Sequence, residues 1–476
     1  MINIKKKFFF LKIFICFSIL FSILFSHKIL SSNDKIILKD NKIYHKMIKA
    51  DPYRYLSHGA EIKDEVENGK NFFLAGRDHY TKFLPPRLAA FYYLITDRDL
   101  FNNLDDREIN LGIHFEYLIF QCLIYFFSIY FLFNSIKNRF DNKVVIILIA
   151  ALCIEPTITQ YNFSFWSESI FFSFQILILA VLLKKNQSEK NLIFLGILLG
   201  FLSLQRQIGF FYIIPVLIFY ILFYKNYFKL SYIILSFVFI QFSIGYINKL
   251  KLNNFHFMTA DSKIEIHRSY VGPVMSKKRS ITLKKFNFDE GIIVKKWLKD
   301  NNINYKNEDK FIVKEKNFVD WMDYRREIIS ENDRVKFDNY IKSRSLNFIK
   351  LHPTDFIKHY FKKSIHMIVL NPFHIYSDLN FSSGEIYFET KAHKKFVPVR
   401  IAYTFLLYLI ALIGLIILIK KKEYKITFLL VLSLLYFFGL VGWSGNTRYF
   451  VPNLIYILVF FSFGLNFILK KYIQNY

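Results

Sequence analysis

The side chains that could do chemistry stand at the ends of long apolar runs. Asp51 follows the first run, in DPYRYLSHG, and Glu168 lies near the start of a later one, in FWSESIFFSF. An ionisable residue where a membrane protein opens to water is a candidate for function. The basic residues in comparable positions are Lys82, Arg87, Arg206 and Arg448. Because arginine offers a planar fork and lysine a point charge, these groups could bind a phosphate.

Each of these residues also has a purely structural interpretation. A loop aspartate is often a helix cap, and an arginine at a span end can extend to lipid headgroups. Lys82 and Arg87 flank Pro85-Pro86 and could be ordinary surface charges of a turn. Glu168 could form an internal ion pair with an arginine from another span. We favour a shared, water-accessible chamber, because the predicted topology brings all of these groups to one side of the membrane.

The composition is that of a membrane protein. Of 476 residues, 53% are hydrophobic and 19% are aromatic, which is too apolar for a soluble chain. A net charge of +27 could indicate nucleic-acid binding, but clusters of Lys and Arg occupy short connectors beside the apolar runs. That placement is the positive-inside pattern, so we predict no nucleic-acid partner.

Apolar runs long enough to cross a bilayer predict an all-α multispanning fold with about ten transmembrane helices. The runs lie near residues 8–26, 113–134, 144–160, 164–183, 191–205, 208–224, 231–248, 399–419, 426–442 and 450–469. We interpret the first run as an uncleaved helix rather than a signal peptide. With Lys5, Lys6 and Lys7 inside, every short basic connector and the C-terminal tail fall on the cytoplasmic side.

Two long segments then face the opposite side, at about residues 27–112 and 249–398. We expect short helices in both loops. The stretch 337–370 predicts amphipathic helices that break near Pro353 and lie against the membrane surface. The predicted organisation is a transmembrane catalytic module at 1–248, an outer loop domain at 249–398 and C-terminal spans at 399–476.

No pattern predicts a metal or a cofactor. His352, His359 and His366 recur every seven residues, which separates their imidazoles by about 10 Å on a helix, too far for one ion. The three cysteines all lie in apolar runs and are expected to be packing residues. The sequence has no Gly-rich nucleotide loop and no zinc signature.

Several motifs, in order and with a common sidedness, resemble the GT-C class of polytopic glycosyltransferases. That class includes protein O-mannosyltransferases and aminoarabinose transferases. The first outer loop carries DPYRYLSHG followed by KFLPPRLAAFYYLI, and a Ser-Glu helix is found in FWSESIFFSFQILIL. The other motifs are the Arg-containing hairpin LLGFLSLQRQIGFFYIIPVL and the final span NTRYFVPNLIYIL. The chain departs from the class at Asp51-Pro52, where many relatives have adjacent acids.

The resemblance implies transfer of a sugar from a polyprenyl-phosphate donor to an acceptor hydroxyl at the outer face of the cytoplasmic (inner) membrane. The acceptor could be a lipid, a glycan or a protein. Asp51 would accept the hydroxyl proton, and Glu168 would position an arginine or the sugar. The groups expected to stabilise the leaving phosphate are Lys82, Arg87, Arg206 and Arg448. The inverting displacement requires no metal.

Two other functions remain open from the sequence. One is an O-antigen polymerase or ligase, which also has many spans and a basic outer loop. The other is a non-enzymatic transporter of lipid-linked glycans. Transporters tend to place ionisable groups near the midplane, often within internal repeats, whereas this chain places them at one face and shows no repeat.

Overall fold

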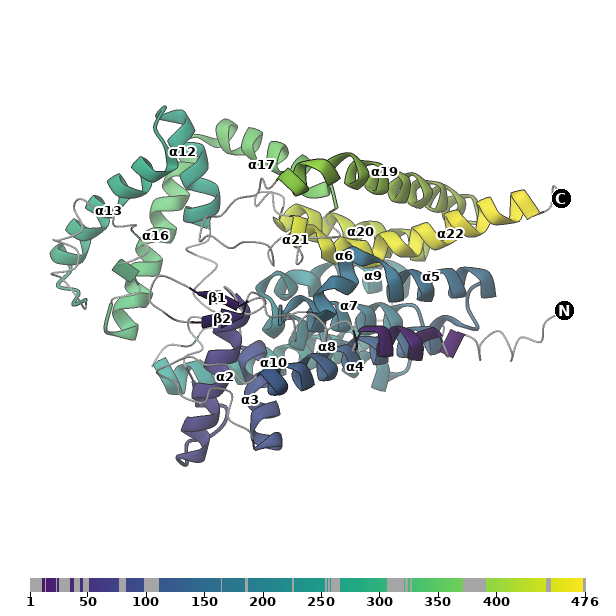
Figure 1. The fold of residues 1–476 in the computed structure, drawn as a ribbon, viewed down its shortest axis with the longest axis horizontal. Coiled ribbons are helices and arrows are strands. Elements are labelled where there is room, and N and C mark those ends of the chain that lie inside the picture. Colours follow the sequence, from purple (N-terminus) through teal and green to yellow (C-terminus); the bar gives the residue numbers. More distant parts are fainter. Residues whose placement is uncertain are drawn as a thin grey trace. The chain divides into compact units, whose positions relative to one another are not determined.

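Where the structure describes the chain, its regular elements are helices and one small antiparallel ribbon (Figure 1). In that ribbon β1 (Lys35–Ile37) pairs antiparallel with β2 (Ile43–His45). The predicted all-α membrane fold is thus confirmed, and the ribbon is an addition to it. The computed structural model describes residues 11–12, 14–22, 24, 35–37, 43–45, 51–76, 83–97, 111–163, 165–184, 187–224, 227–252, 255, 257, 266–305, 321, 324–325, 328–370, 391–441 and 447–473.

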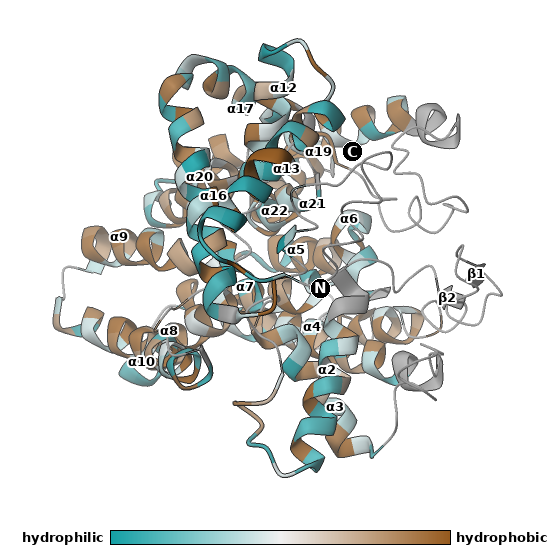
Figure 2. Ribbon diagram, turned by 90° about the vertical axis from the view of Figure 1, so that its left-hand side faces the viewer, coloured by the Kyte–Doolittle hydropathy of each residue, from teal (hydrophilic) through white to brown (hydrophobic). Residues whose placement is uncertain are grey.

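The chain divides into two compact units. The first, here called the membrane unit, comprises Met1–Ile244, Met367–Leu440 and Asn446–Tyr476. The second, here called the loop unit, comprises Gly245–His366 and Val441–Gly445. Figure 2 shows hydrophobic residues along α9 of the membrane unit and hydrophilic residues along much of α16 of the loop unit.

Within the membrane unit, α2 (Asp51–Glu67) packs against α3 (Leu84–Thr96). Pro85 and Pro86 occupy the first turn of α3, where proline removes no helical hydrogen bond. The elements that follow are α4 (Leu111–Ile136), α5 (Asn142–Ile154), α6 (Pro156–Thr159), η3 (Gln160–Phe163), α7 (Glu168–Leu182), α8 (Glu189–Gln205), η4 (Gln207–Tyr212), α9 (Ile213–Tyr224) and α10 (Tyr227–Leu252). The last elements of the unit are α19 (Lys391–Lys420), α20 (Tyr424–Val441), α21 (Thr447–Phe450), η6 (Val451–Asn453) and α22 (Leu454–Ile473).

Among the described residues, five helices are long and apolar enough to cross a membrane. They lie at Glu116–Ile136, Gln207–Tyr224, Tyr227–Lys251, Val397–Lys420 and Arg448–Tyr472. A bent pair, Asn142–Ile154 with Pro156–Asn162, adds a sixth if it forms one span, and α7 and α20 are shorter apolar helices. Helices therefore form at nine of the ten predicted ranges, and the first range is described in part. A total of ten crossings stays a prediction.

Close packing joins the C-terminal spans to each other and to the rest of the membrane unit. Helix α22 contacts α19 and α5, while α4 and α8 both contact α7. Gly414 of α19 and Gly464 of α22 lie so close to the other helix that a Cβ at either would overlap a backbone carbonyl. Small residues at a contact let two membrane helices approach in this way.

The described helices of the membrane unit are interrupted at three places. The α5–α6 break bends the chain by 41°, α8 ends where Arg206 becomes extended, and η6 interrupts the start of the last span. Non-helical backbone at membrane depth requires protein or water to satisfy its polar groups. These breaks therefore mark the places to look for a polar site.

The loop unit has its own small hydrophobic core. Its elements are the π-helical turn η5 (His267–Val271), α12 (Gly272–Lys278), α13 (Leu283–Asp300), α16 (Glu331–Leu351) and α17 (Pro353–Ile368), which ends just inside the membrane unit. Trp321, Phe337 and Ile341 form part of that core, next to the buried ion pair of Arg325 with Asp338. The predicted break near Pro353 is confirmed, since α16 ends at Leu351 and α17 begins at Pro353.

Candidate functional site

Glu168 is the centre of a buried charge cluster in the membrane unit. It is the first residue of α7 and its side chain is only 1% exposed. Its Oε1 atom accepts hydrogen bonds from Nη1 of Arg206 and from Nε of Arg448. A buried carboxylate needs such partners, because an unpaired one would be expensive away from water. The structure thus brings together three of the residues predicted from sequence.

Arg206 reaches Glu168 because the chain leaves the helical conformation at this residue. Its φ of −152° and ψ of 134° are extended, between the end of α8 and the start of η4. The preceding side chain fixes the break, since Nε2 of Gln205 donates to the carbonyl oxygen of Ser167, 2.9 Å away. The α8–η4 break is therefore fastened directly to the residue before Glu168.

Aromatic rings hold the two guanidinium groups in place. The guanidinium carbon of Arg448 lies 3.8 Å from the ring centre of Trp166, and Tyr449 lies 5.5 Å from Arg206 and 5.9 Å from Arg448. Cation–π contacts of this kind favour the charged form of arginine in a partly dry site. Neither Trp166 nor Tyr449 was predicted as a site residue, although Tyr449 follows Arg448 and Trp166 is two residues before Glu168.

The printed contacts of the cluster join two arginines to one carboxylate. Guanidinium groups can hold a phosphate by paired hydrogen bonds, so the residue types suit an anion site. Within the described parts of the chain, no group of three or more metal-ligating side chains comes together.

Glu155 is buried nearby in sequence but has different partners. Its Oε2 atom accepts from the backbone nitrogen of Ile158 at 2.7 Å, which caps α6. Its Oε1 atom accepts from the hydroxyl of Tyr403 at 2.5 Å, a residue of α19. Glu155 therefore closes the α5–α6 break and ties it to a distant span.

Arg87 is an internal anchor in this structure. Its Nη2 atom donates to the carbonyl oxygens of Phe73 and Ala75 at 2.9 and 3.1 Å, and its Nη1 atom donates to that of Phe83 at 3.3 Å. These bonds hold the turn after α2 against the start of α3. A role for Arg87 in binding phosphate stays a prediction.

The remaining predicted site residues can be placed only along the chain. Asp51, predicted as a residue of the first outer loop, is the first residue of α2. Lys82 lies outside the described residues, between α2 and α3. Their roles as base and phosphate ligand stay predictions.

A line of buried polar groups lies deeper in the membrane unit, along α7 and its neighbours. Tyr212 bonds to Ser433 at 2.8 Å and to Tyr456 at 2.7 Å, joining η4, α20 and α22. Nε2 of Gln175 donates to the carbonyl oxygen of Pro452 at 3.4 Å. Hydroxyl and amide groups scattered through apolar runs gave no pattern in the sequence, so this network was not predicted.

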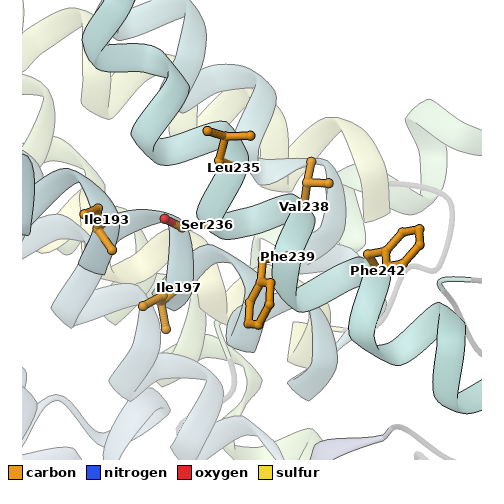
Figure 3. A pocket seen from close by; sticks show the side chains of 7 residues that line it. All are labelled: Ile193, Ile197, Leu235, Ser236, Val238, Phe239 and Phe242. Carbon is orange, nitrogen blue, oxygen red and sulfur yellow. The ribbon is translucent and has the colours of Figure 1, made fainter.

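An apolar groove lies between α8 and α10 (Figure 3). Its volume is about 590 Å³. Its lining residues are Ile193, Ile197, Leu235, Ser236, Val238, Phe239 and Phe242. Close approach of the two helices forms its floor, because a Cβ on Gly196 would lie 2.4 Å from the carbonyl oxygen of Ile233. The groove can hold hydrocarbon but offers no charge for catalysis.

Comparison with known proteins agrees with the resemblance to the GT-C class. Residues 112–246 match the model of the family described as dolichyl-phosphate-mannose-protein mannosyltransferase. This range includes Glu168, Arg206 and the apolar groove, so the predicted resemblance is confirmed for the segment that supplies most of the cluster.

A solved structure similar to the chain is the archaeal oligosaccharyltransferase AglB from Archaeoglobus fulgidus, in complex with an inhibitory peptide and a dolichol-phosphate. The two share 13% sequence identity, with a TM-score of 0.49 over 97% of this chain. The match covers 51% of the AglB chain, so this protein spans about half its length. No curated protein matches the chain.

Proposed function

We propose that the protein is a membrane glycosyltransferase that moves a sugar from a polyprenyl-phosphate donor to an acceptor hydroxyl. The transfer takes place at the outer face of the cytoplasmic membrane, with both termini in the cytoplasm. The observation that carries the proposal is the meeting of Arg206 and Arg448 at Glu168, from segments far apart in the chain. The match of residues 112–246 to the mannosyltransferase family supports the same reaction class.

In the proposed reaction the acceptor oxygen attacks the anomeric carbon of the sugar. The bond from that carbon to the phosphate oxygen breaks, the configuration inverts, and polyprenyl phosphate leaves with the bonding electron pair. Asp51 takes the proton of the acceptor hydroxyl. A general base of this kind contributes a factor of about 10² to 10⁴ in rate.

Arg206 and Arg448 stabilise the phosphate as its negative charge grows. Glu168 is a positioning residue, since it holds two like charges together in a dry environment before the donor arrives. Preorganised charges act more strongly than mobile ones because they need no rearrangement during the reaction. Lys82 is a further candidate for the phosphate, whereas Arg87 serves to hold the turn at residues 73–75.

The apolar groove supplies a path for the prenyl chain of the donor. Ile197 and Ile193 precede Arg206 by nine and thirteen residues on one continuous helix, α8. At 1.5 Å per residue they lie about 14 and 20 Å from the arginine along the axis. A phosphate at Arg206 could therefore extend its tail through the groove and into the bilayer.

The test uses full-length protein reconstituted in liposomes with polyprenyl-phosphate-mannose and a mixture of candidate acceptors. The readout is release of polyprenyl phosphate together with transfer of the labelled sugar. Arg206→Lys and Arg448→Lys keep the charge but remove the fork, and each should lower kcat/KM about 10²- to 10³-fold. Asp51→Asn should abolish turnover while donor binding is retained.

Arg139→Lys is the matched control for the two arginine variants. Nη1 of Arg139 donates to the carbonyl oxygen of Leu183. Leu183 follows the last residue of α7, whereas Glu168 is its first residue, so this substitution should leave transfer unchanged. Unaltered turnover in Asp51→Asn would reject the base assignment. If intact donor crosses the membrane and no sugar is cleaved from it, the enzyme assignment is rejected and a transporter is supported.

A further inference from the structure

Helix α17 of the loop unit exposes a row of large apolar side chains. Ile357, Phe361 and Ile365 are 55%, 63% and 67% exposed. Their spacing of four residues places them one above another on a single stripe of the helix. Three exposed apolar residues in register form a continuous surface, unlike the single ones that any protein shows.

A flank of α17, about 100° from the exposed row, packs against the core of the loop unit. Phe356 is buried there, and its carbonyl oxygen accepts a hydrogen bond from the hydroxyl of Tyr270 at 2.7 Å. The ring of Phe356 also contacts that of Tyr270, with 4.9 Å between the ring centres. The orientation of the helix about its axis is therefore fixed within its unit.

Lysines border the apolar row. Lys358 and Lys362 each follow a residue of the row, which places them about 100° further around the helix, and both are exposed. Lys277, at the end of α12, is not part of this border: with burial, Lys363 and Lys362 it lowers the pKa of His359 to about 4, and His359 lies about 160–200° around the helix from the row.

Acidic groups do not neutralise this border. Asp355 is paired with Lys278 at 3.0 Å, which leaves it unavailable to the other lysines. Within the part of the chain that the structure describes, Lys358 and Lys362 form no ion pair. An apolar stripe with unneutralised lysines along one edge is complementary to an anionic lipid surface.

The end of α17 is fastened to a membrane span. The carbonyl oxygen of Ile368, its last residue, accepts from the hydroxyl of Tyr408 at 2.7 Å, and the backbone nitrogen of Leu370 donates to Thr404 at 3.0 Å. Both partners lie in the first half of the candidate span Val397–Lys420. The last residues of α17 are thus hydrogen-bonded to a candidate membrane span within the membrane unit.

We propose that α17 rests on an anionic bilayer surface, with Ile357, Phe361 and Ile365 in the hydrocarbon border and Lys358 and Lys362 at lipid phosphates. Phosphatidylglycerol and other anionic lipids are the class of partner. The contact ties the loop unit to the membrane independently of any catalytic role.

The test measures depth at single spin labels on the full-length chain. In a variant with Cys16, Cys122 and Cys153 changed to Ala, cysteines replace Ile357, Phe361, Ile365 or, as a solvent control, the exposed Ser280. In nanodiscs of phosphatidylcholine with phosphatidylglycerol, labels on the row should collide more with oxygen than with a water-soluble nickel chelate. The label at residue 280 should show the opposite preference.

The charge is tested with Lys358→Gln and Lys362→Gln combined. Each lysine near an anionic surface contributes a factor of about five to binding, so the docked-to-undocked ratio at residue 361 should fall about 25-fold. The matched variant changes the exposed Lys296 and Lys299 of α13 to Gln and should leave the ratio unchanged.

Either of two outcomes would overturn the proposal. If the spin labels at residues 357, 361 and 365 collide mainly with the nickel chelate, the row lies in water. If they collide with neither oxygen nor the chelate, protein covers the row. Phe361→Trp provides a conservative second variant, whose fluorescence brominated phosphatidylglycerol should quench beyond the level of wild type. Absence of that additional quenching would also reject the contact.

Discussion

Two buried glutamates, Glu168 in the membrane unit and Glu290 in the loop unit, are each held by arginine. Glu290 receives two bonds from Arg344, at 2.5 and 2.8 Å, and lies 3.5 Å from Nε2 of His267. Glu168 instead shares one oxygen between two arginines from different spans. The first arrangement nearly exhausts its donors and is suited to stability. The second brings two arginines from different helices together, an arrangement of residue types suited to binding an anion.

The loop unit should lose stability in acid because of Glu290. Burial alone raises the pKa of this carboxyl, but the hydrogen bonds from Arg344 and His267 outweigh burial and lower its pKa to about 2. A carboxyl whose pKa is lower in the folded state stabilises fully above its unfolded value of about 4.3, and this contribution disappears as the pH falls toward 2. The loss is on the order of 3 kcal/mol in the free energy of unfolding.

Limited proteolysis of the loop unit between pH 6 and pH 3 would measure that loss. Glu290→Gln should remove most of the pH dependence and be less stable than wild type at neutral pH. The matched variant is Asp289→Asn on the exposed face of α13, which has a surface pair with Lys285 at 3.0 Å. Equal acid sensitivity in Glu290→Gln and wild type would contradict this assignment.

At the scale of elements, the α19–α22 pair depends on two glycines. A Cβ on Gly464 would lie 2.0 Å from the carbonyl oxygen of Ile410, and neither backbone can move without opening the contact. We expect Gly464→Ala to destabilise the membrane unit by about 1–3 kcal/mol, the usual range for overpacking. Gly439→Ala is the matched control, because its Cβ would meet nothing within 4 Å. Thermal unfolding in detergent measures both, and equal midpoints would contradict the prediction.

The α8–α10 groove should govern the length of prenyl chain that the protein uses. Ile197→Trp fills the groove, so the KM for a long-chain donor should rise about tenfold, equivalent to about 1.4 kcal/mol. The KM for a donor with a chain too short to reach the groove should not change. Ile214→Trp, on an exposed part of α9, serves as control. A similar rise for both donors would show that the groove does not bind the chain.

At the scale of the whole molecule, the distribution of positive charge predicts which residues share a side of the membrane. In a chain without native cysteines, Asn71→Cys and Ser280→Cys should react with an impermeant maleimide added to intact cells. Lys421→Cys should react only after the membrane is opened, because basic connectors stay in the cytoplasm. Labelling of residues 71 and 421 from the same side would overturn the topology and the proposed site with it.

Much of the fold could be predicted from the sequence because its causes are local. Hydrocarbon thickness and the need to satisfy every backbone group make a long apolar run a helix, whatever surrounds it. Pro353 cannot continue the preceding helix, because its ring removes the backbone N–H and clashes with the preceding turn, but it fits the first turn of a new helix. The break at Arg206 was also visible, as a short polar interruption between two apolar runs.

The candidate site could be predicted only as a set of residues. Sequence indicated that Glu168, Arg206 and Arg448 belong to one face of the membrane, and it could not show which of these charges meet. Packing decides this: Glu168 receives both arginines, whereas the buried Glu155 caps α6 and binds Tyr403.

The sequence by itself determined the class of fold, the helix breaks near Arg206 and Pro353, and the types of side chain available for chemistry. Only the tertiary structure decided which charges meet, that Arg87 is an anchor for backbone carbonyls, and that Trp166 and Tyr449 surround the arginines. The physical reason is distance along the chain. Glu168 is 38 positions from Arg206 and 280 positions from Arg448 along the chain. Contacts over such separations depend on how whole helices pack, which a local sequence pattern does not predict.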